Sequence, residues 1–294
     1  MSATLGEAMA RAASDLAAAG VPESRREARL LVALAAGVET ASVLIHPEFA
    51  LEEAAAVRLA EMVRRRRTRE PVSRLIGRRE FWSLEFEVGA ATLDPRPDSE
   101  TLVESALARI PDRTRGLRVL DLGTGTGCLL LALLSELPNA TGLGLDLASG
   151  AVAVARRNAA ANRLEARAFF AVGSWGAAAG GGFDVVLANP PYVPTAEIAH
   201  LAPEVAQWEP RLALDGGADG LGAYRTLAPD LVRLVAPTGF AVIELGAGQA
   251  DEASAIFRAA GLDVVARGHD LAGLERCLVL AKSKKTLEKP ALPV

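Results

Sequence analysis

Apolar residues in the first part of the chain recur at helical spacing. Residues 5–19 and 23–36 each place an apolar side chain at every third or fourth position, and a glycine follows each run as a helix stop. A third run begins near residue 51 and extends to residue 67. The pattern predicts a helical N-terminal domain over residues 1–72.

The pattern then changes to alternation. Residues 81–88 alternate large apolar and polar side chains, which predicts a strand or a hairpin. Pro95, Arg96 and Pro97 follow and break regular structure. We therefore expect a β-hairpin connector over residues 73–98. Its aromatic side chains are expected to pack inside the protein, with the alternative that one edge of the hairpin faces a site.

From residue 99 onward, short apolar runs alternate with amphipathic runs. The predicted strands lie at residues 117–121, 141–146, 166–171, 183–188, 239–244, 262–266 and 275–281. The predicted helices include residues 100–110, 127–136, 149–161, 220–235 and 249–260. This order predicts an α/β domain over residues 99–284 with a parallel sheet covered on both faces. Residues 285–294 are expected to form a loose tail.

Composition and charge limit the classes of function. The 294-residue chain has a net charge of −4 and a sequence pI near 5.6, which argues against a large nucleic-acid footprint. Cys128 and Cys277 show no zinc-ligand spacing, so we expect no metal and a reducing compartment. The chain lacks an apolar run long enough to cross a bilayer, and its start lacks the regions of a signal peptide. These features predict a cytoplasmic protein.

Four consecutive arginines, at positions 64–67, end the third predicted helix. Cations at a helix C-terminus are favourable by a few tenths of a kcal/mol up to about 1 kcal/mol. We interpret the run as a solvated helix end. A docking patch for an acidic partner is the alternative.

A glycine-rich loop follows the first predicted strand of the α/β domain. The loop consists of Gly123, Thr124, Gly125, Thr126 and Gly127. Glycines allow a backbone to approach a ligand closely, and the N-terminus of the next helix offers free N–H groups. The spacing is G-x-G-x-G rather than the dinucleotide pattern G-x-G-x-x-G, so NAD is a poorer match.

Two further residues fit a ligand that contains an adenosyl group. Asp146 ends the second strand of the α/β domain, where a carboxylate can accept hydrogen bonds from both ribose hydroxyls. The alternative is an aspartate that caps the helix beginning near residue 149. Trp175 follows the third strand and is in a position to pack on adenine, with a core or surface role as the alternative.

The sequence Asn-Pro-Pro-Tyr at residues 189–192, hereafter the tetrad, follows a short buried strand. Ligands of open α/β sheets bind outside the carboxyl ends of the strands. Two prolines remove two N–H donors and stiffen the backbone, which leaves carbonyl oxygens unpaired beside an amide and an aromatic side chain. Such a rim can accept hydrogen bonds from a planar –NH2 group and stack against its flat face. An ordinary Asn-Pro turn is the alternative.

Together the glycine loop, Asp146 and the tetrad resemble the class I S-adenosylmethionine-dependent methyltransferases. The tetrad (NPPY motif) resembles the branch that methylates exocyclic or amide nitrogens. Within this branch the chain is most similar to the release-factor glutamine methyltransferase family. The segments that carry this similarity are residues 95–100, 189–225, 244–249 and 270–276.

The resemblance implies a fold and covers nearly the whole chain. It implies a Rossmann-like sheet, mostly parallel with an antiparallel last strand, behind a small helical domain that docks the substrate. The chain departs from the family at Ser174, where an aspartate is frequent, which weakens the expected adenine contact. The related ribosomal-protein glutamine methyltransferases typically carry a serine where this chain has Pro97.

The chemistry implied by the resemblance is methyl transfer to an amide nitrogen, a poor nucleophile because its lone pair is delocalised into the carbonyl. We expect Asn189 Oδ1 and the Pro190 carbonyl to accept the two N–H groups and hold the nitrogen in line with the methyl group. Tyr192 would form a wall against the amide plane. No strong base is required, so His200 and His269 are interpreted as surface residues.

The resemblance also implies the partners and the site. The substrate would be the glutamine of the Gly-Gly-Gln loop in class 1 peptide chain release factors, whose methylation supports translation termination. The enzyme would be a monomer with no metal, and S-adenosyl-L-homocysteine would be its second product. The expected cofactor-binding residues are Gly123, Thr124, Gly125, Thr126, Gly127, Asp146, Trp175 and Asn189, and the expected substrate-binding residues are Asn189, Pro190, Pro191 and Tyr192.

Two other classes of function remain. An adenine-N6 or guanine-N2 methyltransferase acting on DNA or RNA uses the same tetrad on a flipped base. The acidic balance of the chain and the lack of a basic recognition domain argue against it. A non-catalytic binding module that kept the cofactor fold is the second alternative, and the intact tetrad and glycine loop argue against that.

Overall fold

The computed structural model describes residues 3–283, which form two compact units. The helical unit contains residues up to Gly77 together with Pro203–Trp208. The sheet unit contains Arg78–Ala202 and the chain from Glu209 onward. The tail predicted over residues 285–294 lies outside the described residues.

The helical unit contains the three helices that the apolar spacing predicts. These are α1 (Leu5–Ala18), α2 (Ser24–Ala36) and α4 (Glu53–Arg67). Three shorter helices, which the spacing did not predict, are α3 (Ser42–Ile45), α5 (Val72–Ile76) and α9 (Pro203–Ala206). Leu16, Leu31 and Val32 are fully buried between the long helices, so the apolar faces form one core.

The arginine run at the end of α4 is not simply solvated. Arg66 is only 3% exposed and forms ion pairs with Glu27 at 2.6 Å and Glu204 at 2.7 Å. Arg69 also binds Glu204, at 2.8 Å. Burial raises the pKa of Glu204, but hydrogen bonds from Arg69 and Arg66 outweigh it and hold that pKa at about 2. The interpretation as a solvated helix end is therefore wrong for Arg66, because its side chain is buried and forms ion pairs with two glutamates of the helical unit.

A short hairpin opens the sheet unit, as the alternation predicts. Strands β1 (Arg78–Phe81) and β2 (Leu84–Glu87) pair antiparallel. Trp82 and Ser83 form the turn with φ values of 54° and 57°, the geometry that suits a two-residue hairpin loop. Phe81 and Phe86 are buried edge to face, with ring centroids 6.2 Å apart. The prediction that these aromatic residues pack inside the protein is confirmed.

The main sheet is mostly parallel. Its strands are β3 (Arg118–Leu122), β4 (Thr141–Asp146), β5 (Ala168–Val172), β6 (Phe183–Ala188), β7 (Val235–Glu244), β8 (Leu262–His269) and β9 (Glu275–Lys282). They lie in the order β5-β4-β3-β6-β7-β9-β8. The last strand, β9, runs antiparallel to both neighbours, and the pairs from β5 to β7 are parallel. The expected strand directions are confirmed.

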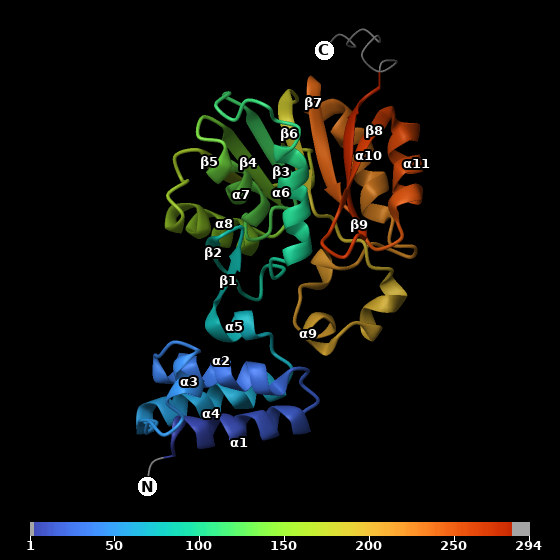
Figure 1. Cartoon of the computed structure of the whole chain (residues 1–294). Coiled ribbons are helices and arrows are strands. Elements are labelled where there is room, and N and C mark those ends of the chain that lie inside the picture. The colour runs from blue at the N-terminus through green and yellow to red at the C-terminus, as the bar shows by residue number, and fades with distance from the viewer. Residues whose placement is uncertain (1–2, 284–294) are drawn as a thin grey trace. The chain divides into compact units, whose positions relative to one another are not determined.

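Helices cover both faces of this sheet (Figure 1). They are α6 (Glu100–Leu107), α7 (Cys128–Glu136), α8 (Ser149–Ala161), α10 (Gly222–Leu234) and α11 (Ala250–Ala260), with short 3-10 turns η1 (Pro97–Ser99), η2 (Thr195–His200) and η3 (Arg211–Ala213). Successive strand residues face opposite layers. Val119 packs with α6, α7 and α8, whereas Leu120 packs with α10 and α11. The unit is a three-layer α/β/α fold.

The strand order determines where a site can form. The chain moves from β3 outward to β4 and β5 and then returns to β6 on the other side of β3. At such a reversal the loops after the two central strands diverge and leave a crevice at their carboxyl ends. The glycine loop follows β3, and the tetrad follows β6. The sheet thus brings the two sequence motifs to one edge.

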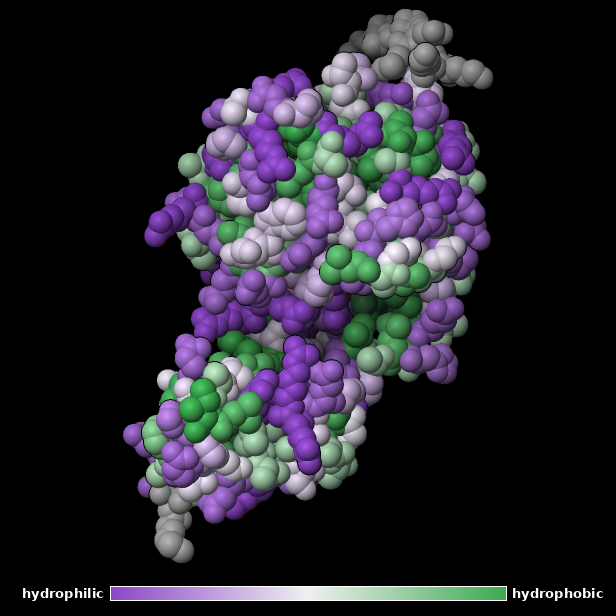
Figure 2. All heavy atoms as spheres, viewed as in Figure 1, coloured by the Kyte–Doolittle hydropathy of each residue, from purple (hydrophilic) through white to green (hydrophobic). Residues whose placement is uncertain are grey.

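The surface gives no sign of a spanning segment within the described residues. No helix in the range 3–283 is long and apolar enough to cross a membrane. On the face seen in Figure 2, hydrophilic residues cover most of both units, and hydrophobic residues form smaller patches among them.

Candidate active site

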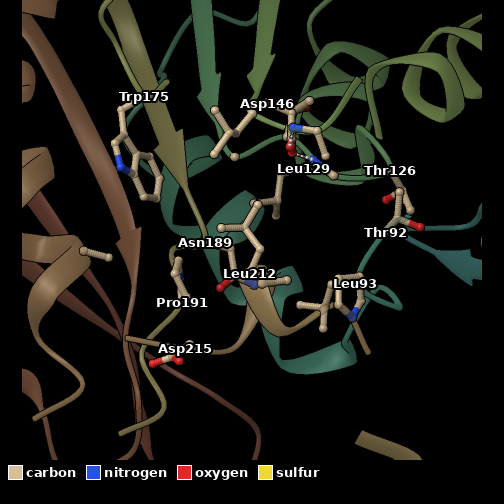
Figure 3. Close-up of a pocket in the computed structure, with 18 of the residues that line it drawn as sticks. Thr92, Leu93, Thr126, Leu129, Asp146, Trp175, Asn189, Pro191, Leu212 and Asp215 are labelled. Atoms are coloured by element: carbon tan, nitrogen blue, oxygen red, sulfur yellow. Dashed lines mark hydrogen bonds between the residues drawn. The ribbon is translucent and has the colours of Figure 1, made fainter. Parts of the chain in front are cut away.

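A cavity of about 480 Å³ lies at the carboxyl edge of the sheet. Its size is that of a site for a small molecule. Asn189 and Pro191 lie across the cavity from Thr92 and Leu93, and Asp146 and Trp175 lie at its far end in the view of Figure 3. The cavity is lined entirely by residues of the sheet unit.

The glycine loop forms one wall. Gly123, Gly125 and Gly127 have φ values of 75°, 55° and 81°, a region that side chains rarely allow. The first four residues of the loop, from Gly123 to Thr126, line the cavity. Gly127 does not line it. Gly127 precedes α7, where an added Cβ would lie 3.3 Å from Ala155 and from Phe170.

A carboxylate that the sequence reasoning did not select lies under this loop. Asp121 is 1% exposed, and its Oδ2 accepts a hydrogen bond of 2.6 Å from Thr124 Oγ1. Its Oδ1 has no hydrogen-bond partner among the described residues. Burial, with a smaller part from the charge of Asp146, raises the pKa of Asp121 to about 7, although the hydrogen bond from Thr124 favours the charged form. The sequence feature that could have identified Asp121 as a site residue was its place near the end of an apolar strand.

Asp146 connects the glycine loop to the start of α8. Its Oδ2 accepts from Gly125 N at 2.9 Å, and its Oδ1 accepts from Ala148 N at 2.9 Å. The second bond supports the turn before the helix, but Asp146 is not the helix cap, because the N-cap of α8 is Ala148 and no side chain of the described residues caps that helix. The same carboxylate lines the cavity. Asp146 therefore stabilises the backbone at both ends of its contact and also lines the space that a ligand would occupy.

Trp175 lies beside the loop. Its φ of 45° is unusual for a large side chain. The ring lies 3.6 Å from the position of a Cβ built on Gly123, is half-buried and lines the cavity. Ser174, the departure from the family, also lines the cavity and is exposed.

The tetrad divides between the cavity and the protein behind it. Asn189 and Pro191 line the cavity, whereas Pro190 and Tyr192 do not. Asn189 Nδ2 donates to Ser99 Oγ at 3.2 Å, and no group of residues 3–283 donates to its Oδ1. Tyr192 donates from its hydroxyl to Glu244 Oε1 at 3.4 Å. Asn189 thus lines the cavity with an amide oxygen that has no donor among residues 3–283. Tyr192 is held in place by its hydrogen bond to Glu244.

Glu244, the last residue of β7, holds the tetrad in place by accepting the hydrogen bond from Tyr192. Its side chain is buried, and burial raises its pKa to about 7, although the Ser99 hydroxyl, Arg276 and the Tyr192 hydroxyl favour the charged form. Arg276 is itself paired with Asp270 at 2.7 Å. Glu244 belongs to a segment that carries the family resemblance, but the sequence alone gave it no role. The rule that selected Asp146, an acidic residue at the end of a strand, would have found it.

The remaining wall consists of two loops that sequence reasoning did not select. Residues 91–96 and most of residues 210–217 line the cavity. Arg96 and Glu209 join the loops through an ion pair of 2.8 Å. The available signals of irregular backbone were Pro95 in the first segment, and Pro210, Gly216 and Gly217 in the second.

The histidines lie away from the cavity. His200 ends η2 and His269 ends β8, and both side chains are exposed. Neither lines the cavity. Their positions are those expected of surface residues.

Comparisons with known families give matches over both units. The PrmC N-terminal domain matches residues 7–77, and the methyltransferase small domain matches residues 97–208. Solved structures with low identity share the fold. The hMettl16 catalytic domain is 15% identical with a TM-score of 0.56, covering 82% of this chain and 85% of its own. A methyltransferase from Pyrococcus furiosus is 16% identical with a TM-score of 0.50, covering 68% of this chain and 89% of its own.

Curated relatives extend over nearly the whole chain. A protein of Rhodospirillum rubrum named release factor glutamine methyltransferase is 50% identical over 275 residues, 94% of this chain and 84% of the relative. A protein of Caulobacter vibrioides with the same name is 43% identical over 292 residues, 99% of this chain and 100% of the relative. The fold is that of the Rossmann-like methyltransferases, and the chain belongs to the release factor glutamine methyltransferase family.

Proposed function

We propose that this protein transfers a methyl group from S-adenosylmethionine to the side-chain amide nitrogen (N5) of the glutamine in the Gly-Gly-Gln motif of class 1 peptide chain release factors. The observation that carries the proposal is that Asn189 lines the cavity with its amide nitrogen bound to Ser99 and with no donor to its amide oxygen among residues 3–283. An acceptor of this kind suits a substrate –NH2 group. The membership of the family supports the choice of glutamine.

The cavity residues fit the proposed cofactor. Gly125 leaves open space where a side chain would stand, since no atom lies within 4 Å of its Cβ position. Asp121 Oδ1 is buried without a hydrogen-bond partner beneath the loop, and Asp146 offers a carboxylate at the cavity. Gly123, Thr124, Gly125 and Thr126 would hold the cofactor together with Asp146, Trp175 and Asn189, and Gly127 would support the loop from outside the cavity lining. S-adenosylmethionine supplies a strongly activated methyl group when it is bound.

The reaction then depends on alignment. Asn189 Oδ1 accepts one N–H group of the substrate amide at the cavity, and the carbonyl of the neighbouring Pro190, a buried residue outside the cavity lining, would accept the second once the substrate is bound, so that the nitrogen is fixed in position. Both acceptors also stabilise the positive charge that develops on this nitrogen, because they are held in place before the reaction. The methylated nitrogen is acidic and loses its extra proton to water, so the chain does not need a strong base. No metal takes part in the proposed reaction.

Pro191 and Tyr192 have different parts in this proposal. Pro191 contributes an apolar wall beside Asn189 inside the cavity. Tyr192 braces the tetrad from behind, through its hydroxyl on Glu244 and through its carbonyl, which accepts from Gln249 Nε2 at 3.0 Å. The aromatic residue therefore fixes the rim, and the substrate meets the residues in front of it.

The substrate proposal includes the helical unit. A glutamine that follows two glycines has little side-chain bulk on that side and can extend into the cavity. The helical N-terminal domain over residues 1–72 would hold the rest of the release factor. Such a substrate places the enzyme in the cytoplasm, where it would act as a monomer and support translation termination. S-adenosyl-L-homocysteine is the second product.

The direct test offers one labelled methyl donor to three acceptors. Purified protein is incubated with labelled S-adenosylmethionine and, separately, with release factor, DNA and RNA. We expect label on the release factor alone, within the peptide that contains Gly-Gly-Gln. Label on DNA or RNA instead would identify an adenine-N6 or guanine-N2 methyltransferase, and absence of label on all three would leave a binding module.

The part of Asp146 in cofactor binding can be tested by calorimetric titration. Asp146→Ala should weaken S-adenosylmethionine binding by roughly 10- to 100-fold, because charge-assisted hydrogen bonds of about 1.5–3 kcal/mol are lost. The bond to Gly125 N is lost as well, which loosens the loop.

Asp112 offers a matched control for this variant. Its carboxylate also accepts from the backbone N–H two residues ahead, that of Thr114, but in an exposed turn outside the cavity. Asp112→Ala should bind the cofactor as the parent does. If Asp146→Ala also binds it unchanged, Asp146 is only a support for α8.

A further inference from the structure

A line of polar groups runs behind the cavity from the tetrad into the protein. It begins at Asn189 Nδ2, which donates to Ser99 Oγ at 3.2 Å. Ser99 is 2% exposed and lies at the end of η1, next to α6. The Ser99 hydroxyl also lies near enough to Glu244 to favour the ionised form of this carboxylate. Three groups from three separate segments therefore meet behind the amide that faces the cavity.

Glu244 is the charged end of this line. It ends β7, the strand that lies beside β6 and therefore beside the tetrad. Its side chain is 2% exposed, Oε1 accepts from the Tyr192 hydroxyl, and Oε2 has no hydrogen-bond partner among residues 3–283. A carboxylate with one oxygen unpaired can accept a further hydrogen bond from a hydroxyl group.

Other ionisable groups also face Glu244. They are Arg276, Asp98, Tyr192, Tyr224, Cys128 and Cys277. Arg276 is the cation among them, and its pairs with Asp98 and Asp270 divide its charge. Burial raises the pKa of both cysteines and of both tyrosines, so these four groups are neutral near pH 7. Glu244 is the member of the set that changes charge near neutral pH.

The direction of the hydrogen bonds between Asn189, Ser99 and Glu244 decides which end of the Asn189 amide, Nδ2 or Oδ1, faces Ser99. A serine hydroxyl has one proton. If that proton points to an ionised Glu244, Oγ can only accept from Asn189, so the –NH2 end must face Ser99 and Oδ1 must face the cavity. The two ends of an asparagine amide have nearly the same shape, and only their partners distinguish them.

We propose that Ser99 and Glu244 are positioning residues that fix the amide of Asn189 with its oxygen toward the substrate nitrogen. This inference rests on the proposed function, because it assumes a substrate –NH2 group in the cavity. The reversed amide would place –NH2 against –NH2 and prevent alignment. Glu244 must be ionised for the line to keep its direction.

A double-mutant cycle tests the part of Ser99. Ser99→Ala should lower single-turnover methyl transfer to release factor by about tenfold, the effect of one lost hydrogen bond. In a chain that already carries Asn189→Ala, the same change should cause little further loss, since Ser99 acts through Asn189. Ser99→Thr retains the hydroxyl and should restore part of the rate. Equal losses in both backgrounds, or a parental rate for Ser99→Ala, would overturn the proposal.

Ser105→Ala serves as the matched control. Ser105 is half-buried on α6 and its hydroxyl contacts Cys277 Sγ at 3.3 Å, outside the cavity lining. It should transfer methyl groups at the parental rate. Thermal unfolding of each variant separates a folding defect from a loss of alignment.

The pH dependence tests the part of Glu244. Because burial raises the pKa of Glu244 to about 7, the ionised fraction, and with it the rate, should rise as pH increases through about 7. Glu244→Gln cannot ionise and offers Ser99 a donor as well as an acceptor, so it no longer forces the direction, and its rate should be lower than that of the parent above pH 7 and should lack this rise. A rise of the same size in Glu244→Gln would contradict the proposal.

The parent protein separates this inference from the proposed function. If the parent transfers no methyl group to release factor, the proposed function fails. If the parent is active and the Ser99 and Glu244 variants behave as it does, the proposed function stands and only the positioning inference fails.

Discussion

Asn189→Ala is expected to lose methyl transfer by at least about 10²–10³-fold, the scale on which one preorganised transition-state partner acts. Cofactor binding should stay nearly normal, since the glycine loop and Asp146 form a separate wall of the cavity. The loss arises because Oδ1 both fixes the substrate nitrogen and stabilises its developing charge. The assay is single-turnover transfer to purified release factor at saturating cofactor, with cofactor affinity measured separately.

Asn189→Asp separates acceptor strength from orientation. The change keeps the shape and adds a full negative charge, so activity would survive if acceptor strength alone mattered. We expect a loss, because the carboxylate has no –NH2 to donate to Ser99 Oγ. A half-buried carboxylate beside prolines also loses hydration.

Asn139 provides the control for both variants. Its amide also donates through Nδ2, to the Thr114 carbonyl at 2.7 Å, but it is exposed and lies outside the cavity lining. Asn139→Ala should transfer methyl groups as the parent does. If Asn189→Ala does so too, the proposed active site is wrong.

Periodicity in the sequence was sufficient for most of the fold. Strands β4 and β6 were predicted with their observed bounds because their apolar runs are short and end at polar or proline residues. The missed elements, α3, α5 and α9, are helices of four or five residues, shorter than two helical turns. A run of that length shows no period. Only packing within the helical unit, such as that of Glu204 with Arg66, stabilises them.

The site was predictable where its residues follow strands. The glycine loop, Asp146 and Asn189 each follow a strand of the sheet, so strand prediction alone brought them to one edge. Ser99 and Glu244 could not be linked to Asn189 in this way, because tertiary packing alone joins the three segments. The sequence also did not show which side chains of the tetrad would point into the cavity. Asn189 and Tyr192 belong to one motif, yet only Asn189 lines the cavity.

The packing behind the tetrad leads to a second prediction with a large effect, at Gly220. Its φ is 75°, and a Cβ there would collide with the Tyr192 carbonyl and lie 2.7 Å from Gln249 Nε2. These are the two groups that hydrogen-bond at 3.0 Å to fasten the tetrad. The Tyr192 carbonyl is backbone and cannot rotate away, so the added methyl group must displace the tetrad itself.

Gly220→Ala should therefore reduce both stability and methyl transfer. A left-handed alanine costs roughly 1–2 kcal/mol, and overpacking typically adds about 1–3 kcal/mol. Displacement of Asn189 by about 1 Å should lower single-turnover transfer by about 10²-fold.

Gly273 separates the strain from the collision, because it has a φ of 79° with no atom within 4 Å of its Cβ position. It lies in an exposed turn outside the cavity lining, so Gly273→Ala should carry the strain alone and keep the parental rate of transfer. Urea unfolding and single-turnover transfer of both variants provide the comparison. Equal losses of stability in the two variants, with transfer intact in both, would mean that the backbone around Gly220 yields without moving the tetrad. A larger loss in Gly220→Ala that also removes transfer would show that the tetrad depends on the close backbone contact that glycine permits at this position.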